Sequence, residues 1–425
     1  MNKRILTLLI SMLLSQPILA GQAALNVSDY AARAMQQAQQ LADDKKVVEA
    51  IKRLESTEIS RADDIAALNK MLGLYYWQEE RFDASILSLE KALKVNAFPS
   101  DEAWFTRRML AQLYLTQGEF KKAIPLLQTL LNAVPQNENE AEIWRYLAQA
   151  QYSVEKWQAT LKATQGFLRV QSKPDSTILS LALAANVQLE QWKSVVPIAK
   201  QLISLQPNNK NWWLQAYNAY LNLKQEKSAL DMLALAELQG ISLNESEIKA
   251  LAYLYAGEGI YLKAAQTLAR LDDAQHDLQL LKLQAQYWQA AKEWESALSY
   301  WQKAAMQEPK YLWEVAILQN ELKRYQQVIA SLDTMQNPQR QFDGQMLKIN
   351  ALYRLDRLEE AYLQAKKADA IKSTQQTTSW LNFLSHKMKA SHKVEVLDEE
   401  QSEQSEQKGG TASRPHHQKE RQDNS

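Results

Sequence analysis

The chain has 425 residues, and its 49 Lys and Arg residues are balanced by 49 Asp and Glu residues. This neutral balance gives no general attraction to nucleic acid or to an anionic membrane surface. The length suits several domains or one extended array, and only ten residues are glycine. Long runs rich in Ala, Leu, Gln, Lys and Glu favour helix over strand, so the predicted fold class is all-α.

The first twenty residues have the layout of a secretory signal peptide. Lys3 and Arg4 precede a ten-residue apolar run (5–14), and the following SQPILA offers a small residue for cleavage after Ala20, with Ala23 as a second possibility. The apolar run is too short to span a bilayer comfortably. We therefore expect residues 1–20 to be removed and the chain to be exported, with a retained anchor as the alternative.

The sequence contains no cysteine. This excludes disulfides, a lipid-modified cysteine, thiol catalysis and zinc sites built from cysteine. An exported chain without disulfides must be stabilised by packing alone. In a bacterium with two membranes, the expected location is the periplasm.

A short pattern recurs through most of the remaining chain: an aromatic residue, two variable residues and a small residue. Clear copies are FDAS at 82–85, FKKA at 120–123 and WESA at 294–297, whereas LEEA at 358–361 lacks the aromatic residue. The small position recurs every 31 to 38 residues. Its ten occurrences are Ala50, Ser85, Ala123, Thr160, Val195, Ala229, Ala264, Ala297, Val328 and Ala361.

This period resembles that of the tetratricopeptide (TPR) repeat, a helix–turn–helix unit of about 34 residues. The segments MLGLYY (71–76), MLAQLY (109–114) and ALAYLY (250–255) are similar to the first helix of that repeat. Gly118 and Gly259 fall in the turn between the helices, and prolines such as Pro135, twelve residues after a small position, fall where the repeat closes. The resemblance implies a right-handed superhelix of about ten repeats.

The residue types suit such a fold. A small residue lets the second helix lie close to the first, and the aromatic residue fills the gap between helices. Because one helix pair cannot bury both of its faces, stacked pairs build one continuous core. We expect the array to span residues 27–371.

The C-terminal part changes character twice. The segment 375–390, QQTTSWLNFLSHKMKA, predicts a capping helix that turns Trp380, Leu381 and Leu384 towards the last repeat. Residues 393–425 contain few large apolar side chains and are therefore predicted to be a disordered polar tail.

No catalytic or cofactor motif is present. The sequence has no Walker-type GxxxxGK[ST], no GxGxxG and no GxSxG, and its five histidines lack metal-ligand spacing. We predict that the protein is not an enzyme and binds no cofactor or metal.

The resemblance implies that first helices line a concave groove. We number each repeat so that its small residue is position 20. Position 5 is then basic in five of eight repeats, and the other three repeats have Ser180, Leu214 and Trp313 there. Amides and rings at positions 9 and 12 complete a surface suited to an extended acidic peptide. The alternative is that these are ordinary solvated positions. The predicted partner-binding residues are Lys70, Trp77, Arg108, Gln112, Arg145, Gln149, Tyr152, Asn218, Lys249, Tyr253, Lys282, Gln286 and Trp313.

One segment resembles a particular group of TPR proteins. Residues 211–243, NWWLQAYNAYLNLKQEKSALDMLALAELQGISL, look like the periplasmic TPR proteins that accompany TonB energy-transduction systems. This implies a scaffold that binds an envelope protein and assists TonB-dependent transport. Two alternatives stay open: a scaffold for exopolysaccharide export and an activator of a cell-wall hydrolase.

Overall fold

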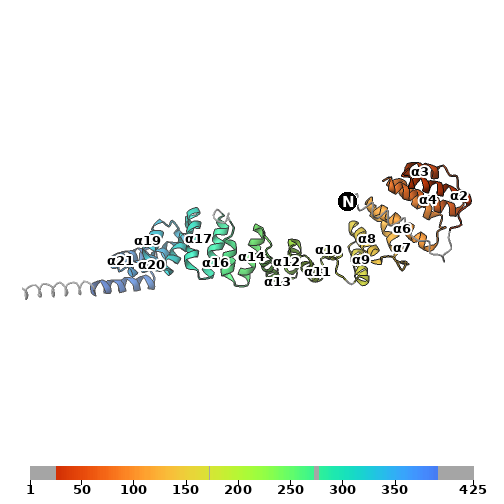
Figure 1. Cartoon of the computed structure of the whole chain (residues 1–425). Coiled ribbons are helices and arrows are strands. Elements are labelled where there is room, and N and C mark those ends of the chain that lie inside the picture. The colour runs from red at the N-terminus through yellow and green to blue at the C-terminus, as the bar shows by residue number, and fades with distance from the viewer. Residues whose placement is uncertain (1–24, 172, 272–276, 391–425) are drawn as a thin grey trace, which may run out of the picture. The chain divides into compact units, whose positions relative to one another are not determined.

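The structure, a computed structural model of the chain, describes residues 25–171, 173–271 and 277–390 (Figure 1). The predicted signal peptide and polar tail lie outside these residues and stay predictions. Within the described ranges the regular structure is helical and no β-strand occurs. No helix in this part of the chain is both long and apolar enough to cross a membrane.

The chain divides into two compact units between Ile241 and Ser242. The described residues of unit 1 form six helix hairpins, and each first helix has an even label. The hairpins are α2 (Asp29–Asp43) with α3 (Val47–Glu55), α4 (Ala62–Gln78) with α5 (Phe82–Lys94), α6 (Ser100–Thr116) with α7 (Phe120–Leu130), α8 (Glu140–Ser153) with α9 (Trp157–Val170), α10 (Ser176–Gln188) with α11 (Trp192–Leu205), and α12 (Lys210–Asn222) with α13 (Glu226–Leu238).

The described residues of unit 2 form four hairpins and a final helix that spans residues 375–390. The 3₁₀ turns Pro309–Tyr311 and Pro338–Arg340 precede two of the first helices. The hairpins are α14 (Glu245–Gly257) with α15 (Tyr261–Leu268), α16 (Leu278–Ala290) with α17 (Trp294–Gln307), α18 (Leu312–Glu321) with α19 (Tyr325–Thr334), and α20 (Gln341–Arg354) with α21 (Leu358–Ile371).

Packing follows chain order within each unit. Each helix contacts its hairpin partner and the helix that follows, and the first helices α8 and α10 also contact each other. Such nearest-neighbour packing is the hallmark of a repeat array. The predicted all-α class, with ten helix–turn–helix repeats in the described residues, is confirmed.

The turn inside every hairpin has the same backbone geometry. Five residues before each small position, one residue has positive φ: Lys45, Glu80, Gly118, Glu155, Glu190, Lys224, Gly259, Lys292, Lys323 and Asp356. The next residue donates its amide hydrogen to a carbonyl five residues back, as Arg81 does to Tyr76 at 2.8 Å and Glu119 to Tyr114 at 2.8 Å. These are Schellman turns, which end the first helix and satisfy its last carbonyls.

The small positions lie in the interior of the hairpins. All ten are fully buried, at 0% exposure. In the second hairpin Ser85 Oγ donates to the Gly73 carbonyl of α4 at 2.6 Å. A Cβ atom at Gly73 would lie 2.6 Å from Leu89, so the two helices leave no room there for a larger side chain.

The helix 375–390 covers the end of the last repeat. Leu384 is fully buried and belongs to the same apolar cluster as Leu352 and Ala361. Trp380 and Leu381 pack partly buried against this cluster. An apolar face that would otherwise lie open to water is thereby covered, as terminal caps of repeat arrays do.

Candidate functional site

The predicted basic residues of unit 1 form ion pairs between successive repeats. Lys70 Nζ on α4 lies 2.8 Å from Glu102 Oε1 on α6. Arg108 on α6 pairs with Glu142 on α8 at 2.9 Å and also with Glu138, just before α8. Each cation thus binds a carboxylate of the next repeat.

Arg145 continues the series one repeat further. Its guanidinium lies 2.9 Å from Asp175 Oδ2, while Asp175 Oδ1 accepts the backbone amide of Ile178 at the start of α10. One carboxylate therefore caps a helix and holds the preceding repeat. Arg145 Nε is buried and has no hydrogen-bond partner in the described residues. We call the set Lys70–Glu102, Arg108–Glu138/Glu142 and Arg145–Asp175 the charge ladder.

Tyrosines beside the charge ladder add further links. Tyr146 donates to Glu142 Oε1 at 3.0 Å, so Glu142 on α8 binds both Arg108 of α6 and Tyr146 of its own helix. Burial, together with the Glu142 carboxylate, raises the pKa of Tyr146 to about 12. The phenol therefore keeps its proton and its role as a donor to a higher pH than an exposed tyrosine does.

The charge ladder shows that the basic residues of unit 1 are already paired with carboxylates of the same chain. A partner carboxylate that approached Arg108 would compete with Glu138 and Glu142, which are already in place. Partly exposed ion pairs of this kind each contribute roughly 0.2–1 kcal/mol to stability. The arrangement links repeat to repeat, and the cations are neutralised within the chain.

The other predicted residues of unit 1 lie in different environments. Trp77 was predicted to line the groove, but only 9% of it is exposed, and it belongs to the same buried cluster as Leu110 and Leu113 of α6. The next repeat therefore covers this ring. Gln112 and Gln149 are half-buried, whereas Asn218 on α12 is exposed.

In unit 2 the predicted residues contact side chains of their own helix or of the next repeat. Lys249 pairs with Glu245 of its own helix, and Lys282 donates to Gln279 at 3.2 Å while lying 5.6 Å from the Tyr311 ring centroid. Tyr253 is 69% exposed and Gln286 is also exposed. Trp313 is half-buried, and its ring centroid lies 5.1 Å from the Arg340 guanidinium.

Where the charge ladder stops, unit 1 has a hollow of about 500 Å³ between α8, α10 and α12. Position 5 of these last two helices is Ser180 and Leu214, so no cation is present to continue the ladder. Only first helices contribute to the hollow. Its lining residues are Tyr152, Ser180, Leu181, Leu183, Ala184, Val187, Gln188, Asn211, Trp212 and Gln215.

The lining of this hollow, which we call the neutral hollow, combines two kinds of chemistry. None of its residues is charged. The Tyr152 and Trp212 rings and the aliphatic side chains of α10 offer apolar contact, while the amides of Gln188, Asn211 and Gln215 can donate and accept hydrogen bonds. This combination suits a polypeptide segment, because a peptide brings apolar side chains and backbone polar groups together.

Of the predicted residues, the neutral hollow contains Tyr152 alone. The sequence analysis searched for charged positions and therefore did not predict Trp212 or the amides of the hollow. The adjacent Trp212 and Trp213 could have indicated the site, because neighbouring residues on a helix point about 100° apart and both rings cannot be buried on one face. Trp213 is buried and donates to the Pro207 carbonyl at 2.8 Å, so Trp212 is left at the surface.

Within the described residues no group of three or more His, Asp or Glu side chains could hold a metal ion. The carboxylates of unit 1 described above are instead engaged by cations and helix ends.

A comparison with protein-family models found no match, and a comparison with curated proteins found none either. Solved structures do show similarity. A tetratricopeptide repeat protein from Parabacteroides merdae ATCC 43184 is 14% identical, with a TM-score of 0.34 over 61% of this chain and 99% of that one. YrrB, described as a TPR protein with an unusual peptide-binding site, is 16% identical, with a TM-score of 0.34 over 44% and 91% of the two chains.

MamA from Desulfovibrio magneticus RS-1 is 15% identical, with a TM-score of 0.32 over 43% of this chain and 99% of that one. These TM-scores are low, so the fold described here rests on the turns and buried positions of this chain.

Proposed function

We propose that this protein is a non-catalytic scaffold of the TPR type that binds a segment of a partner protein in the neutral hollow of α8, α10 and α12. The observation that carries the proposal is the contrast within unit 1. The cations Lys70, Arg108 and Arg145 are neutralised inside the charge ladder, whereas the hollow beside them is uncharged and lined by rings and amides.

The chemistry of the lining defines the segment. An uncharged stretch with apolar side chains fits, because burying an unpaired charge has a desolvation free energy larger than the contacts of that group would offset. Amides on the rim can bond the backbone of such a stretch, and Trp212 and Tyr152 can pack against its side chains. An acidic segment would find no free cation in the hollow.

We further propose that the scaffold is exported to the periplasm and serves as an accessory component of a TonB-dependent transport system. Residues 1–20 support export, and the similarity of residues 211–243 to TonB-associated TPR proteins supports the system. That segment includes Asn211, Trp212 and Gln215 of the neutral hollow. The segment that suggests the system thus also supplies part of the proposed binding site.

The test is site-specific photo-crosslinking in intact cells, with a photoreactive residue at Gln188 in the neutral hollow and a matched control at Gln158. Both glutamines are exposed, but Gln158 lies on the second helix α9. We expect Gln188 alone to capture a partner, which mass spectrometry identifies, and Trp212→Ala to abolish the capture.

A third variant separates the hollow from the charge ladder. Arg108→Gln should leave capture unchanged if the segment is uncharged. Capture that is lost with Arg108→Gln but retained with Trp212→Ala would refute the neutral hollow and favour the acidic-peptide groove. A captured glycan synthase or wall hydrolase, with no TonB component, would refute the transport role alone.

A further inference from the structure

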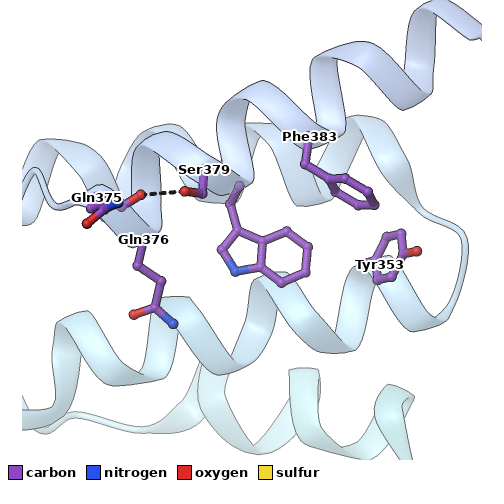
Figure 2. A pocket seen from close by; sticks show the side chains of 6 residues that line it. Tyr353, Gln375, Gln376, Ser379 and Phe383 are labelled. Atoms are coloured by element: carbon purple, nitrogen blue, oxygen red, sulfur yellow. Dashed lines mark hydrogen bonds between the residues drawn. The ribbon is translucent and has the colours of Figure 1, made fainter.

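A second hollow, of about 650 Å³, lies within unit 2 between the end of α20 and the helix 375–390 (Figure 2). It is separate from the neutral hollow and shares no residue with it. Its six lining residues are Tyr353, Gln375, Gln376, Ser379, Trp380 and Phe383.

The three rings form one surface. The ring centroids lie 5.7 Å apart for Tyr353 and Trp380, 5.4 Å for Tyr353 and Phe383, and 5.9 Å for Trp380 and Phe383. The interplanar angles of 63° to 79° show edge-to-face packing, which holds each ring in place. The rings touch one another, so a ligand would lie over them and not between them.

Part of this aromatic surface belongs to the cap of the last repeat, because Tyr353 and Trp380 pack partly buried against the cluster that contains Leu384. The neighbouring Phe383 is not part of that cluster and is 45% exposed. In Figure 2 the Phe383 ring lies next to the Tyr353 ring. Three large rings, one on α20 and two on the helix 375–390, thus remain partly open to solvent.

The polar groups around the rings are uncharged and available. The side-chain amides of Gln375 and Gln376, the Trp380 indole N–H and the Tyr353 hydroxyl have no hydrogen-bond partner among the described residues. Ser379 Oγ donates to the Gln375 carbonyl at 2.7 Å and can still accept. Donors and acceptors therefore border the apolar surface along one helix.

Three observations narrow the ligand class. The hollow is lined by only six residues, which matches the contact surface of a small ligand. The Lys387 ammonium lies 5.0 Å from the Tyr353 centroid and would repel a cation at that ring. None of the six lining residues is charged, so the lining itself offers no counter-charge to an ionic ligand. What fits is a small, uncharged ligand with an apolar face and hydroxyl groups at its rim.

We propose that this hollow is a binding site for an uncharged saccharide, with a sugar ring stacked over Phe383 and Trp380 and its hydroxyls bonded to Gln375 and Gln376. A pyranose ring presents C–H groups on its face, which the negative faces of aromatic rings attract. Its hydroxyls both donate and accept, as the two amides do. A volume of about 650 Å³ is within the usual range for small-ligand sites.

The test is isothermal titration calorimetry, with ligand-observed NMR, on the exported form of the chain. The probes are three neutral tetrasaccharides: chitotetraose, cellotetraose and maltotetraose. We expect millimolar or tighter binding of at least one probe, and Phe383→Ala should raise its Kd by about tenfold. The matched control is Tyr253→Ala, which removes an exposed ring elsewhere in unit 2.

The probes also separate two sources of the same chemistry. Binding of chitotetraose alone supports the site and indicates an N-acetylated wall glycan, whereas binding of cellotetraose or maltotetraose supports it and indicates an exported glucan. The proposal is overturned if no probe binds, or if Phe383→Ala and Tyr253→Ala weaken binding equally. Trp380→Phe keeps an aromatic ring and removes the indole N–H, so it should weaken binding less than Phe383→Ala does.

Discussion

Gly166 tests how closely the helices of one repeat approach each other. It lies on α9 opposite Trp144 of α8, and a Cβ atom added there would lie 2.5 Å from the ring atoms Cδ2 and Cε3. Carbon atoms are at optimal separation at about 3.5–4.0 Å, so the ring or a helix would have to move by about 1 Å. Trp144 is held in place, because its Nε1 donates to Glu140 Oε1 at 2.9 Å and Arg169 lies 5.9 Å from the ring.

Two effects oppose each other in Gly166→Ala. Replacing a helical glycine with alanine stabilises by roughly 0.5–1 kcal/mol. Overpacking a closed contact costs typically about 1–3 kcal/mol. Since the ring cannot turn away freely, we expect the contact to dominate and the free energy of unfolding to fall by about 1 kcal/mol.

Urea unfolding followed by far-UV circular dichroism measures this change. Hydrogen exchange of α8 and α9 localises it, since repeat arrays need not unfold in one step. In a Trp144→Ala background the contact is absent, and the same glycine substitution should stabilise by roughly 0.5–1 kcal/mol. A Gly166→Ala variant more stable than the parent chain would refute the close approach of α8 and α9.

Two further predictions concern the hairpin turns and the buried tyrosines. Glu155 has a φ of 58°, so Glu155→Gly should raise the free energy of unfolding by about 1 kcal/mol in urea denaturation. Gly118 has a φ of 73°, so Gly118→Ala should lower the free energy of unfolding. No change in either variant would contradict the shared turn geometry. Burial raises the pKa of Tyr75 and of Tyr146 to about 12 from the ordinary value of 10.0, with nearby carboxylates adding to the effect. Because the folded state keeps a proton that the unfolded state loses, this stability is fully present below pH 10 and is lost as the pH rises through 12. Thermal unfolding against pH should show that decline, and the decline should be shallower in Tyr146→Phe. An equal slope would contradict the raised pKa of Tyr146 in the folded state.

The repeat could be read from the sequence because its determinants are local. The small position, the turn five residues before it and the end of the first helix all lie within a few residues of one another, as in Glu80, Arg81 and Ser85. Each acts through backbone hydrogen bonds or the contact of two adjacent helices. Ten copies of one local pattern therefore sufficed to predict ten hairpins.

The charge ladder could not be read in the same way. The basic residues at position 5 were visible in the sequence, but their partners are 30 to 34 residues away, in the next repeat. Whether Arg108 faces a partner protein or Glu142 depends on how successive hairpins pack against each other. The sequence pattern of a single repeat does not predict that packing.

The sequence by itself determined the all-α class, the period and the buried small residues, since these follow from short-range backbone and packing rules. The tertiary structure decided which polar groups remain available. Trp77 is buried against α6, and Arg108 and Arg145 are neutralised by carboxylates of the next repeat. Trp212 lines the neutral hollow, and Phe383 lines the hollow of unit 2. Availability depends on the side chains of two or three repeats acting together, because burial and ion pairing are properties of the packed neighbours and not of a residue alone.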